Sequence, residues 1–308
     1  MTHIVGRSLG RFGSVLLITF VISACRGRDP ERARDTEAAG LVSNLQRRAG
    51  SPLAPNDGTA IDSTAGVFKP RFAAATLAAE RGLARVTLPA NASAALHLED
   101  AATNVAVDVT VRGASAAPGR ATNGYVVYAK ALPSGAALVH RPLPSGAEDF
   151  VAFDAKPAAT EVVYEVKLGR GAEGLRLLEQ TLEVLDGGGV PRLRVAPPYI
   201  VGADGARTDA TLAVAGCAVD TSPAAPWGRR VTAPGAATCQ LKVTWPSTGV
   251  AYPAILDPRW TTTGSMATPR QDHTMTLLST GNVLVTGGRG TGTTGLATSE
   301  IYNTTMGS

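Results

Sequence analysis

Apolar and polar residues alternate through the middle of the chain, which is the pattern of half-buried β-strands. The clearest stretch is 105–111, where four valines occupy every second position. Turn-forming residues separate such runs, including Pro-Ser-Gly-Ala at both 133–136 and 144–147. The same pattern predicts further strands over 84–88, 125–131, 137–140, 149–153, 162–168, 175–185, 191–195, 211–219, 240–245 and 251–255.

Short strands at this spacing favour an all-β fold, with an antiparallel β-sandwich region over 67–258, either as one unit or as two small sandwiches in series. No alternation of strands with helical patterns is visible. Gly and Pro number 34 and 20 in 308 residues, which suits turn-rich structure. The apolar share of 44% is typical of a globular protein.

The N-terminus has a different pattern, in which Arg7 and Arg11 precede an apolar run over 15–22. Eight residues are far fewer than the roughly 20 that a membrane-spanning helix needs. The combination is typical of a secretion signal.

The apolar run ends at Ile22-Ser23-Ala24-Cys25. This sequence resembles the lipobox of bacterial lipoproteins. The resemblance implies that 1–24 is a signal peptide, that Cys25 is acylated, and that the protein is anchored to a membrane of the cell envelope, in the outer membrane or facing the periplasm. An ordinary cleaved signal is the alternative.

Residues 25–66 are predicted to be a charged tether and linker that lifts the folded part from the lipid. Residues 26–48 are dense in charge, and 49–66 are rich in Gly, Pro, Ser and Asp. An amphipathic helix is the alternative for the first part, because Asp29-Pro30 suits a helix start and Leu41 and Leu45 lie four residues apart.

The formal net charge of +4 belongs to the N-terminus. Residues 1–50 carry eight arginines and four acids, which leaves 21 basic and 21 acidic side chains in 51–308. A neutral body has no basic stripe that could follow a phosphate backbone, so we expect no nucleic-acid partner.

Cys217 and Cys239 remain as a pair in a chain predicted to be exported. A disulfide across this Pro- and Gly-rich stretch contributes about 3–4 kcal/mol in the loop-entropy model. Two cysteines without neighbouring histidines are too few for a metal site, and their spacing differs from that of redox pairs. We therefore predict a structural disulfide.

The segment from Tyr125 to Trp260 contains several strand-like motifs. It resembles an N-terminal module of large, repeat-containing bacterial surface proteins, and this likeness bears on location more than on activity. The motifs are at 148–150, 182–186, 191–195 and 252–258.

The last part, 259–308, contains a strand that ends in a double glycine and a later Glu-x-Tyr. It resembles a kelch repeat of the galactose-oxidase-like type. Paired glycines allow close approach of backbones, and we expect an ion pair between Arg270 and Glu300. The residues that carry the resemblance are Trp260, Arg270, His273, Gly287, Gly288, Glu300 and Tyr302.

One kelch unit makes one blade of a propeller, and propellers close with about four to eight blades. We therefore expect an incomplete propeller: a truncated gene, a fragment of a longer protein, or a single blade that packs against the sandwich.

Few residues in the sequence suggest catalysis or cofactor binding. Gly290 to Gly295 satisfies GxGxxG, but a strand-like segment follows where a nucleotide-binding loop requires a helix, so an inter-strand loop is favoured. Asp272-His273 could serve half of a catalytic triad with Ser265 or Ser279, yet no GxSxG motif supports it, and we interpret His273 as a strand-edge residue. No catalytic residue, metal site or cofactor is predicted.

These observations favour a non-enzymatic, lipid-anchored envelope protein with a structural, adhesive or binding role and with protein or glycan partners outside the cytoplasm. Two alternatives remain. One is a truncated galactose-oxidase-like enzyme, and the other is a surface protein that binds carbohydrate through Trp227, Trp245 or Trp260.

Overall fold

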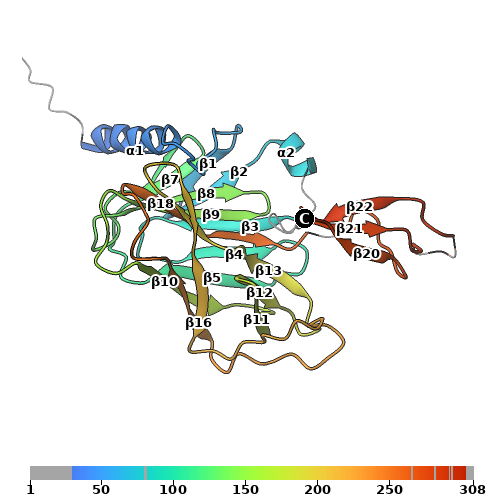
Figure 1. Ribbon diagram of the computed structural model, residues 1–308. Coiled ribbons are helices and arrows are strands. Elements are labelled where there is room, and N and C mark those ends of the chain that lie inside the picture. The colour runs from blue at the N-terminus through green and yellow to red at the C-terminus, as the bar shows by residue number, and fades with distance from the viewer. Residues whose placement is uncertain are drawn as a thin grey trace, which may run out of the picture.

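The computed structural model describes residues 30–79, 82–264, 266–280, 282–290, 292 and 294–302. Within them the chain forms three antiparallel sheets and two helices, α1 (Pro30–Gln46) and α2 (Ala74–Ala79) (Figure 1). The predicted all-β class is confirmed. Neither of these helices combines the length and the apolar character needed to cross a membrane. The signal segment and Cys25 lie outside the described residues.

The first sheet has eight strands in the order β1-β2-β3-β4-β5-β10-β17-β16. In β5 the valines at 107, 109 and 111 are buried, whereas Asp108 and Thr110 are half-buried, as the alternation predicts. The bounds are β1 (Ala60–Thr64), β2 (Val67–Arg71), β3 (Ala84–Pro89), β4 (Leu96–Asp100), β5 (Ala106–Val111), β10 (Glu161–Leu168), β16 (Thr211–Ala215) and β17 (Thr238–Thr244).

The second sheet has eleven strands. Eight of them follow the order β11-β12-β13-β19-β9-β18-β14-β15, and β6, β7 and β8 extend it beside β9. The bounds are β6 (Arg120–Thr122), β7 (Tyr125–Tyr128), β8 (Ala137–Leu143), β9 (Gly146–Phe153), β11 (Gly174–Leu178), β12 (Thr181–Leu185), β13 (Pro191–Val195), β14 (Tyr199–Val201), β15 (Arg207–Asp209), β18 (Ala254–Asp257) and β19 (Arg259–Thr262).

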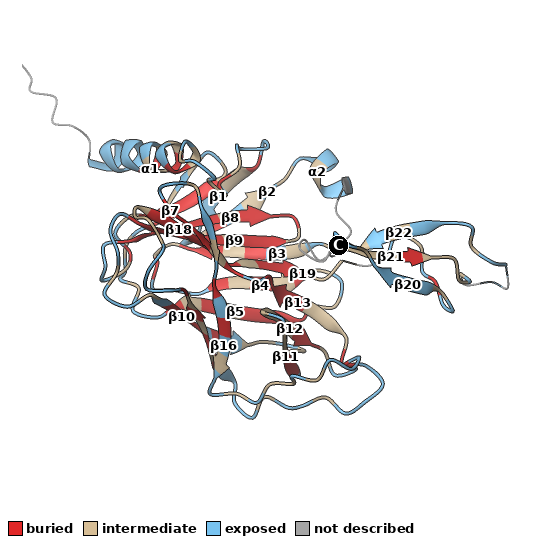
Figure 2. Cartoon of the chain, in the orientation of Figure 1, coloured by how far each residue is buried: buried red, intermediate tan, exposed pale blue. Residues whose placement is uncertain are grey.

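The two large sheets share one hydrophobic core. A single cluster of buried side chains runs from Phe68 to Trp260 and contains residues from both sheets (Figure 2). At its centre the rings of Tyr164 and Trp260 meet edge to face, with centroids 5.9 Å apart. The strands between 67 and 258 therefore bury a common core instead of two successive ones. We call these two sheets with α1 the body.

Helix α1 corrects the prediction of a tether at 25–66. Its side chains Ala38, Val42 and Leu45 are buried in a second cluster, against Tyr125 and Phe150 of the eleven-stranded sheet. The three positions lie three or four residues apart and so share one helix face. Because this face covers the sheet, residues 30–46 are part of the fold.

The predicted linker at 49–66 is also folded. Leu53 is 4% exposed and belongs to the cluster under α1, and β1 pairs with β2 along its whole length. Gly, Pro and Ser favour turns, but a single buried leucine and one edge strand are enough to hold a segment of that composition on the body.

The third sheet projects from the body at the end far from the start of α1 (Figure 1). It consists of β20 (Thr274–Leu277), β21 (Val283–Thr286) and β22 (Ser299–Tyr302) in that order. We call it the C-terminal sheet. Trp260, which the kelch resemblance assigned to this unit, lies instead in β19 of the body, where it pairs across from Ala147 and is 2% exposed. An aromatic side chain of this size is best buried in the large core.

Candidate functional site

The outward face of the eleven-stranded sheet has two parts. One part is apolar and is covered by α1. The other is not covered by α1 and carries a set of charged side chains with one tyrosine, which we call the charged face. Its members are Glu148, Arg176, Glu183, Arg194, Tyr199, Asp257 and Arg259.

A row of opposite charges crosses three neighbouring strands of this face. Arg176 on β11 lies opposite Glu183 on β12, which lies opposite Arg194 on β13. Nη1 of Arg176 donates to Oε2 of Glu183 over 2.8 Å, and Nη1 of Arg194 lies 3.3 Å from the hydroxyl of Tyr302 in the C-terminal sheet. The row thus connects the body to the C-terminal sheet. Cross-strand pairs of opposite charge stabilise a sheet by about 0.2–1 kcal/mol each.

A break in strand register brings more side chains to the same face. Arg194 and Tyr199 are five residues apart, a spacing that would place them on opposite faces of a regular strand. Here Arg194 pairs with Thr261 and Tyr199 pairs with Asp257, so one extra residue lies between the two pairs. This β-bulge at 196–198 turns Tyr199 to the charged face.

The charged face is hollowed beside the bulge. This cavity, which we call the small hollow, has a volume of about 430 Å³. Side chains of both signs line it together with short apolar residues of the bulge. They include Glu148, Arg194, Ala196, Pro197, Tyr199, Arg207, Asp257 and Arg259.

Two buried polar atoms at the small hollow have no hydrogen-bond partner among the described residues: Oδ1 of Asp257 and Nε of Arg259. Asp257 is only 5% exposed. Burial, reinforced by the charge of Glu148, raises the pKa of Asp257 to about 7. A buried polar group without a partner costs about 1–3 kcal/mol, so water or a bound molecule in the hollow would lower the free energy.

Tyr199 forms one wall of the small hollow. Its hydroxyl lies near the Asp257 carboxylate, and the guanidinium of Arg207 lies 3.7 Å from its ring centre. Burial raises the pKa of Tyr199 above its ordinary value, so the phenol stays protonated. The ring is therefore held in a fixed position, with one of its faces covered by Arg207.

A larger cavity of about 880 Å³, the large hollow, lies between the body and the C-terminal sheet. It shares Arg176, Glu183 and Tyr302 with the small hollow, so the two adjoin. Trp227 reaches it from the disulfide-closed loop and is 57% exposed. Trp245 and Trp260 are buried in the core. Of the three tryptophans considered for ligand binding, the structure places Trp227 at a cavity with polar neighbours.

Polar contacts organise the C-terminal sheet around Arg270. Its guanidinium, with a fully buried side chain, donates to the carbonyl oxygens of Gly287 and Thr298 over 2.9 and 2.8 Å, and to Oε1 of Glu300 over 2.8 Å. The predicted Arg270–Glu300 ion pair is confirmed. Glu300 also accepts from the backbone N–H groups of Ala267 and Thr268, and these bonds with Arg270 lower its pKa to about 2.

The other residues of the C-terminal motif shape the backbone of the sheet or lie at its border. Gly288 has a φ of +84°, and a Cβ there would lie 2.5 Å from the carbonyl oxygen of Gln271, so the expected close backbone approach is present. Gly287, at +65°, has the same left-handed conformation. His273 comes directly before β20 and lines the large hollow.

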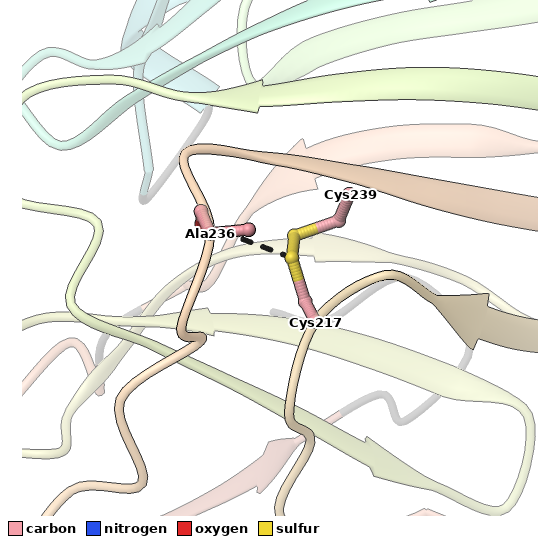
Figure 3. Close-up of a disulfide and its surroundings, with 3 residues drawn as sticks. All are labelled: Cys217, Ala236 and Cys239. Atoms are coloured by element: carbon pink, nitrogen blue, oxygen red, sulfur yellow. Dashed lines mark hydrogen bonds between the residues drawn. A yellow bond between two sulfur atoms is a disulfide. The ribbon is translucent and has the colours of Figure 1, made fainter.

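The predicted disulfide between Cys217 and Cys239 is present and closes a separation of 22 residues. Cys239 is buried in β17, whereas Cys217 follows β16 and lies 3.8 Å from the carbonyl oxygen of Ala236 (Figure 3). The bond fixes the base of the loop that carries Trp227.

In the part of the chain that the structure describes, no three or more His, Cys, Asp and Glu side chains gather into a cation site. Comparison of the chain with known protein families, with curated proteins and with solved structures gives no match. What the molecule does must therefore be argued from its own geometry.

Sequence reasoning missed the small hollow. Asp257 belongs to the 252–258 motif, which was interpreted only as a sign of location, whereas Arg259 and Tyr199 lie outside the motifs, and Tyr199 reaches the same face only through the bulge. The doublet Pro197-Pro198 inside an otherwise strand-like run was the available indication, because proline interrupts strand pairing.

Proposed function

We propose that this chain is a non-enzymatic, lipid-anchored protein of the cell envelope whose body has a binding role. The Cys217–Cys239 disulfide is the observation that carries the proposal, because such bonds persist in oxidising compartments outside the cytoplasm. The signal-like segment before Cys25 agrees with export. The two adjoining hollows supply the binding surface.

The anchor would hold the body close to the lipid. Pro30, the first residue of α1, is the fifth residue after Cys25, and an extended chain over that span reaches at most about 17 Å. Because α1 is packed on the body, its N-terminal end would face the membrane surface, with the C-terminal sheet at the far end of the molecule (Figure 1).

We also propose the finer architecture: a β-sandwich body followed by a kelch-like unit. Support comes from the core shared by two sheets, the buried Arg270–Glu300 pair and the close approach at Gly288.

Metabolic labelling with a palmitate analogue tests the anchor. Wild type should incorporate the label and Cys25→Ala should lose it, since the thiol is the acylated group. Ser23→Ala, two residues away, is the matched control and should retain it. Undiminished incorporation by Cys25→Ala would contradict the proposal.

Carbohydrate binding is the second candidate for the binding role, and the exposure of Trp227 at the large hollow favours it. An indole face beside Glu183 and Arg192 combines an apolar platform with hydrogen-bonding groups. Trp227→Ala should weaken retention of the chain on immobilised polysaccharide, whereas Trp227→Tyr, which keeps an aromatic face, should largely preserve it. Equal retention of all three proteins would exclude this role for Trp227.

A further inference from the structure

The small hollow presents two buried groups of opposite hydrogen-bonding character. Oδ1 of Asp257 and Nε of Arg259 have no partner among the described residues. The two residues are two positions apart around Pro258 and share the outward face of the sheet, one paired with Tyr199 and the other with Glu148. Both residues line the hollow, so a guest there meets an acceptor residue and a donor residue.

A hydroxyl group meets this requirement, because it donates one hydrogen bond and accepts others. It can donate to the Asp257 carboxylate while it accepts from the Arg259 guanidinium, and two neighbouring hydroxyls can divide these roles. A simple anion would satisfy Arg259 but would meet the carboxylates of Asp257 and Glu148, which line the same hollow.

The remaining walls suit a ring with an apolar face. Ala196, Pro197 and Leu178 supply short apolar surface, and the Tyr199 ring is held in place by Arg207. The volume of about 430 Å³ lies within the range of small-molecule sites. An extended polypeptide is a poor guest, because the strand backbones under the hollow already pair with one another and leave no free edge for it.

We infer that the small hollow is a saccharide-binding subsite, in which Asp257 and Arg259 bind the hydroxyl groups of one sugar unit and Tyr199 packs against its ring. The inference rests on the proposed binding role. It adds a second contact area beside the large hollow, and the shared Arg176, Glu183 and Tyr302 would allow one oligosaccharide to occupy both.

The test is an array of neutral and uronic-acid oligosaccharides probed with the purified full chain, followed by calorimetric titration with the saccharides that bind. Asp257→Leu and Arg259→Met keep side-chain volume but remove the hydrogen-bonding atoms, so each should weaken binding about 10- to 100-fold. Asp62→Asn changes a carboxylate on β1 that does not line the hollow and should bind as wild type. Thermal melts of each variant show whether the body remains folded.

Three outcomes would overturn the inference. Binding that is undiminished in folded Asp257→Leu and Arg259→Met shows that saccharides bind elsewhere. If Trp227→Ala then weakens binding, the large hollow is the site. Absence of binding across the array at millimolar concentration shows that the small hollow holds water only. If Asp257→Leu or Arg259→Met weakens binding and Asp62→Asn weakens it equally, the loss is a nonspecific charge effect. Palmitate labelling is independent of all three, so the proposed envelope anchor can stand if this subsite fails.

Discussion

The body and the C-terminal sheet are held together by different forces. The body buries two apolar clusters, the larger of which extends from Phe68 to Trp260. In the described residues of the C-terminal sheet, Val285 is the one hydrophobic side chain below 5% exposure, and the strands are connected through Arg270. The difference shows that a buried guanidinium with several acceptors can organise a sheet too small to bury a core.

The C-terminal sheet also exposes large hydrophobic side chains of the kind that the body buries. Met275, Leu277 and Ile301 are 64%, 71% and 56% exposed, and β20 has no charged residue along its outer edge (Figure 2). Edges of this kind favour pairing with other strands. We therefore expect the two regions to respond separately to mutation and to pH.

Trp260→Ala should have the largest effect and should act on the body. Removal of a fully buried tryptophan lowers the free energy of unfolding by about 3–5 kcal/mol, because it leaves a cavity beside Tyr164. Chemical denaturation monitored by circular dichroism measures the change. Trp227→Ala, at an exposed position, should shift the midpoint little, and equal shifts would contradict the placement of Trp260 in the core.

Arg270→Met should release the C-terminal sheet while the body stays folded. It removes the donors to Gly287, Thr298 and Glu300 and leaves a carboxylate without its cation, at a cost of about 3 kcal/mol. Hydrogen exchange of the β21 amides should accelerate strongly, and that of β5 should not change.

Arg289→Met is the matched control for Arg270→Met. Arg289 pairs with Asp272 in the same region, but both side chains are at least half exposed, and such pairs contribute about 0–1 kcal/mol. Comparable acceleration in both variants would mean that Arg270 has no special role.

Replacement of both Cys217 and Cys239 by serine should destabilise the body by about 2–4 kcal/mol in the loop-entropy model. The change should appear in the denaturation midpoint of the body, since Cys239 lies in β17 and Cys217 follows β16, and not in exchange of β21. Intact mass under non-reducing conditions confirms the bond in the wild type. A midpoint unaffected by the double substitution would show that the loop is held by other contacts.

Acid should destabilise the C-terminal sheet. The pKa of Glu300 is lowered from 4.5 to about 2, so its contribution to stability is complete above about pH 4.5 and is lost as the pH falls through 2. Exchange of the β21 amides, followed from pH 5 downwards, should show this loss in wild type. Glu300→Gln should remove that part of the pH dependence.

The stability of the body should depend on pH in the opposite direction, with a loss as the pH rises. The pKa of Asp257 is raised from 3.8 to about 7, so the folded body retains a proton that the unfolded chain has released. Stability should decrease as the pH rises from about 4 to 7. Melting temperatures of Asp257→Asn should lack this decrease, whereas Asp209→Asn should follow the wild type.

Local patterns predicted the features that depend on neighbouring positions. The valine alternation at 105–111 and the spacing of Leu41 and Leu45 each correspond to a face that is packed in the structure. The paired cysteines and the Arg270–Glu300 pair were also anticipated, because their residue types suit few other roles. The tether prediction failed because the charge density along 26–48 was given more weight than the apolar spacing of the helix alternative, whereas Ala38, Val42 and Leu45 contact the sheet.

Features that depend on unusual backbone conformation could not be predicted in this way. The stretch 175–185 looked like one strand, but it is two, β11 and β12, joined through Glu179 and Gln180. Both residues have positive φ, at 47° and 67°, where a hairpin usually has Asn or Gly. Oε1 of Gln180 accepts from the backbone N–H of Leu212 over 2.6 Å, a contact that tertiary structure alone supplies.

The bulge at 196–198 determines which side chains of this segment reach the charged face. Side chains on one strand alternate between two environments, so a single inserted residue exchanges the inner and outer sets for every position that follows until the strand ends. Removal of Pro198 alone would leave Tyr199 four residues after Arg194, the spacing at which a regular strand places both side chains on one face, so the bulge would be lost and Tyr199 would still face outward. With the present length, a straightened strand would instead turn Tyr199 toward the core, so the bulge is the feature that keeps this ring on the charged face.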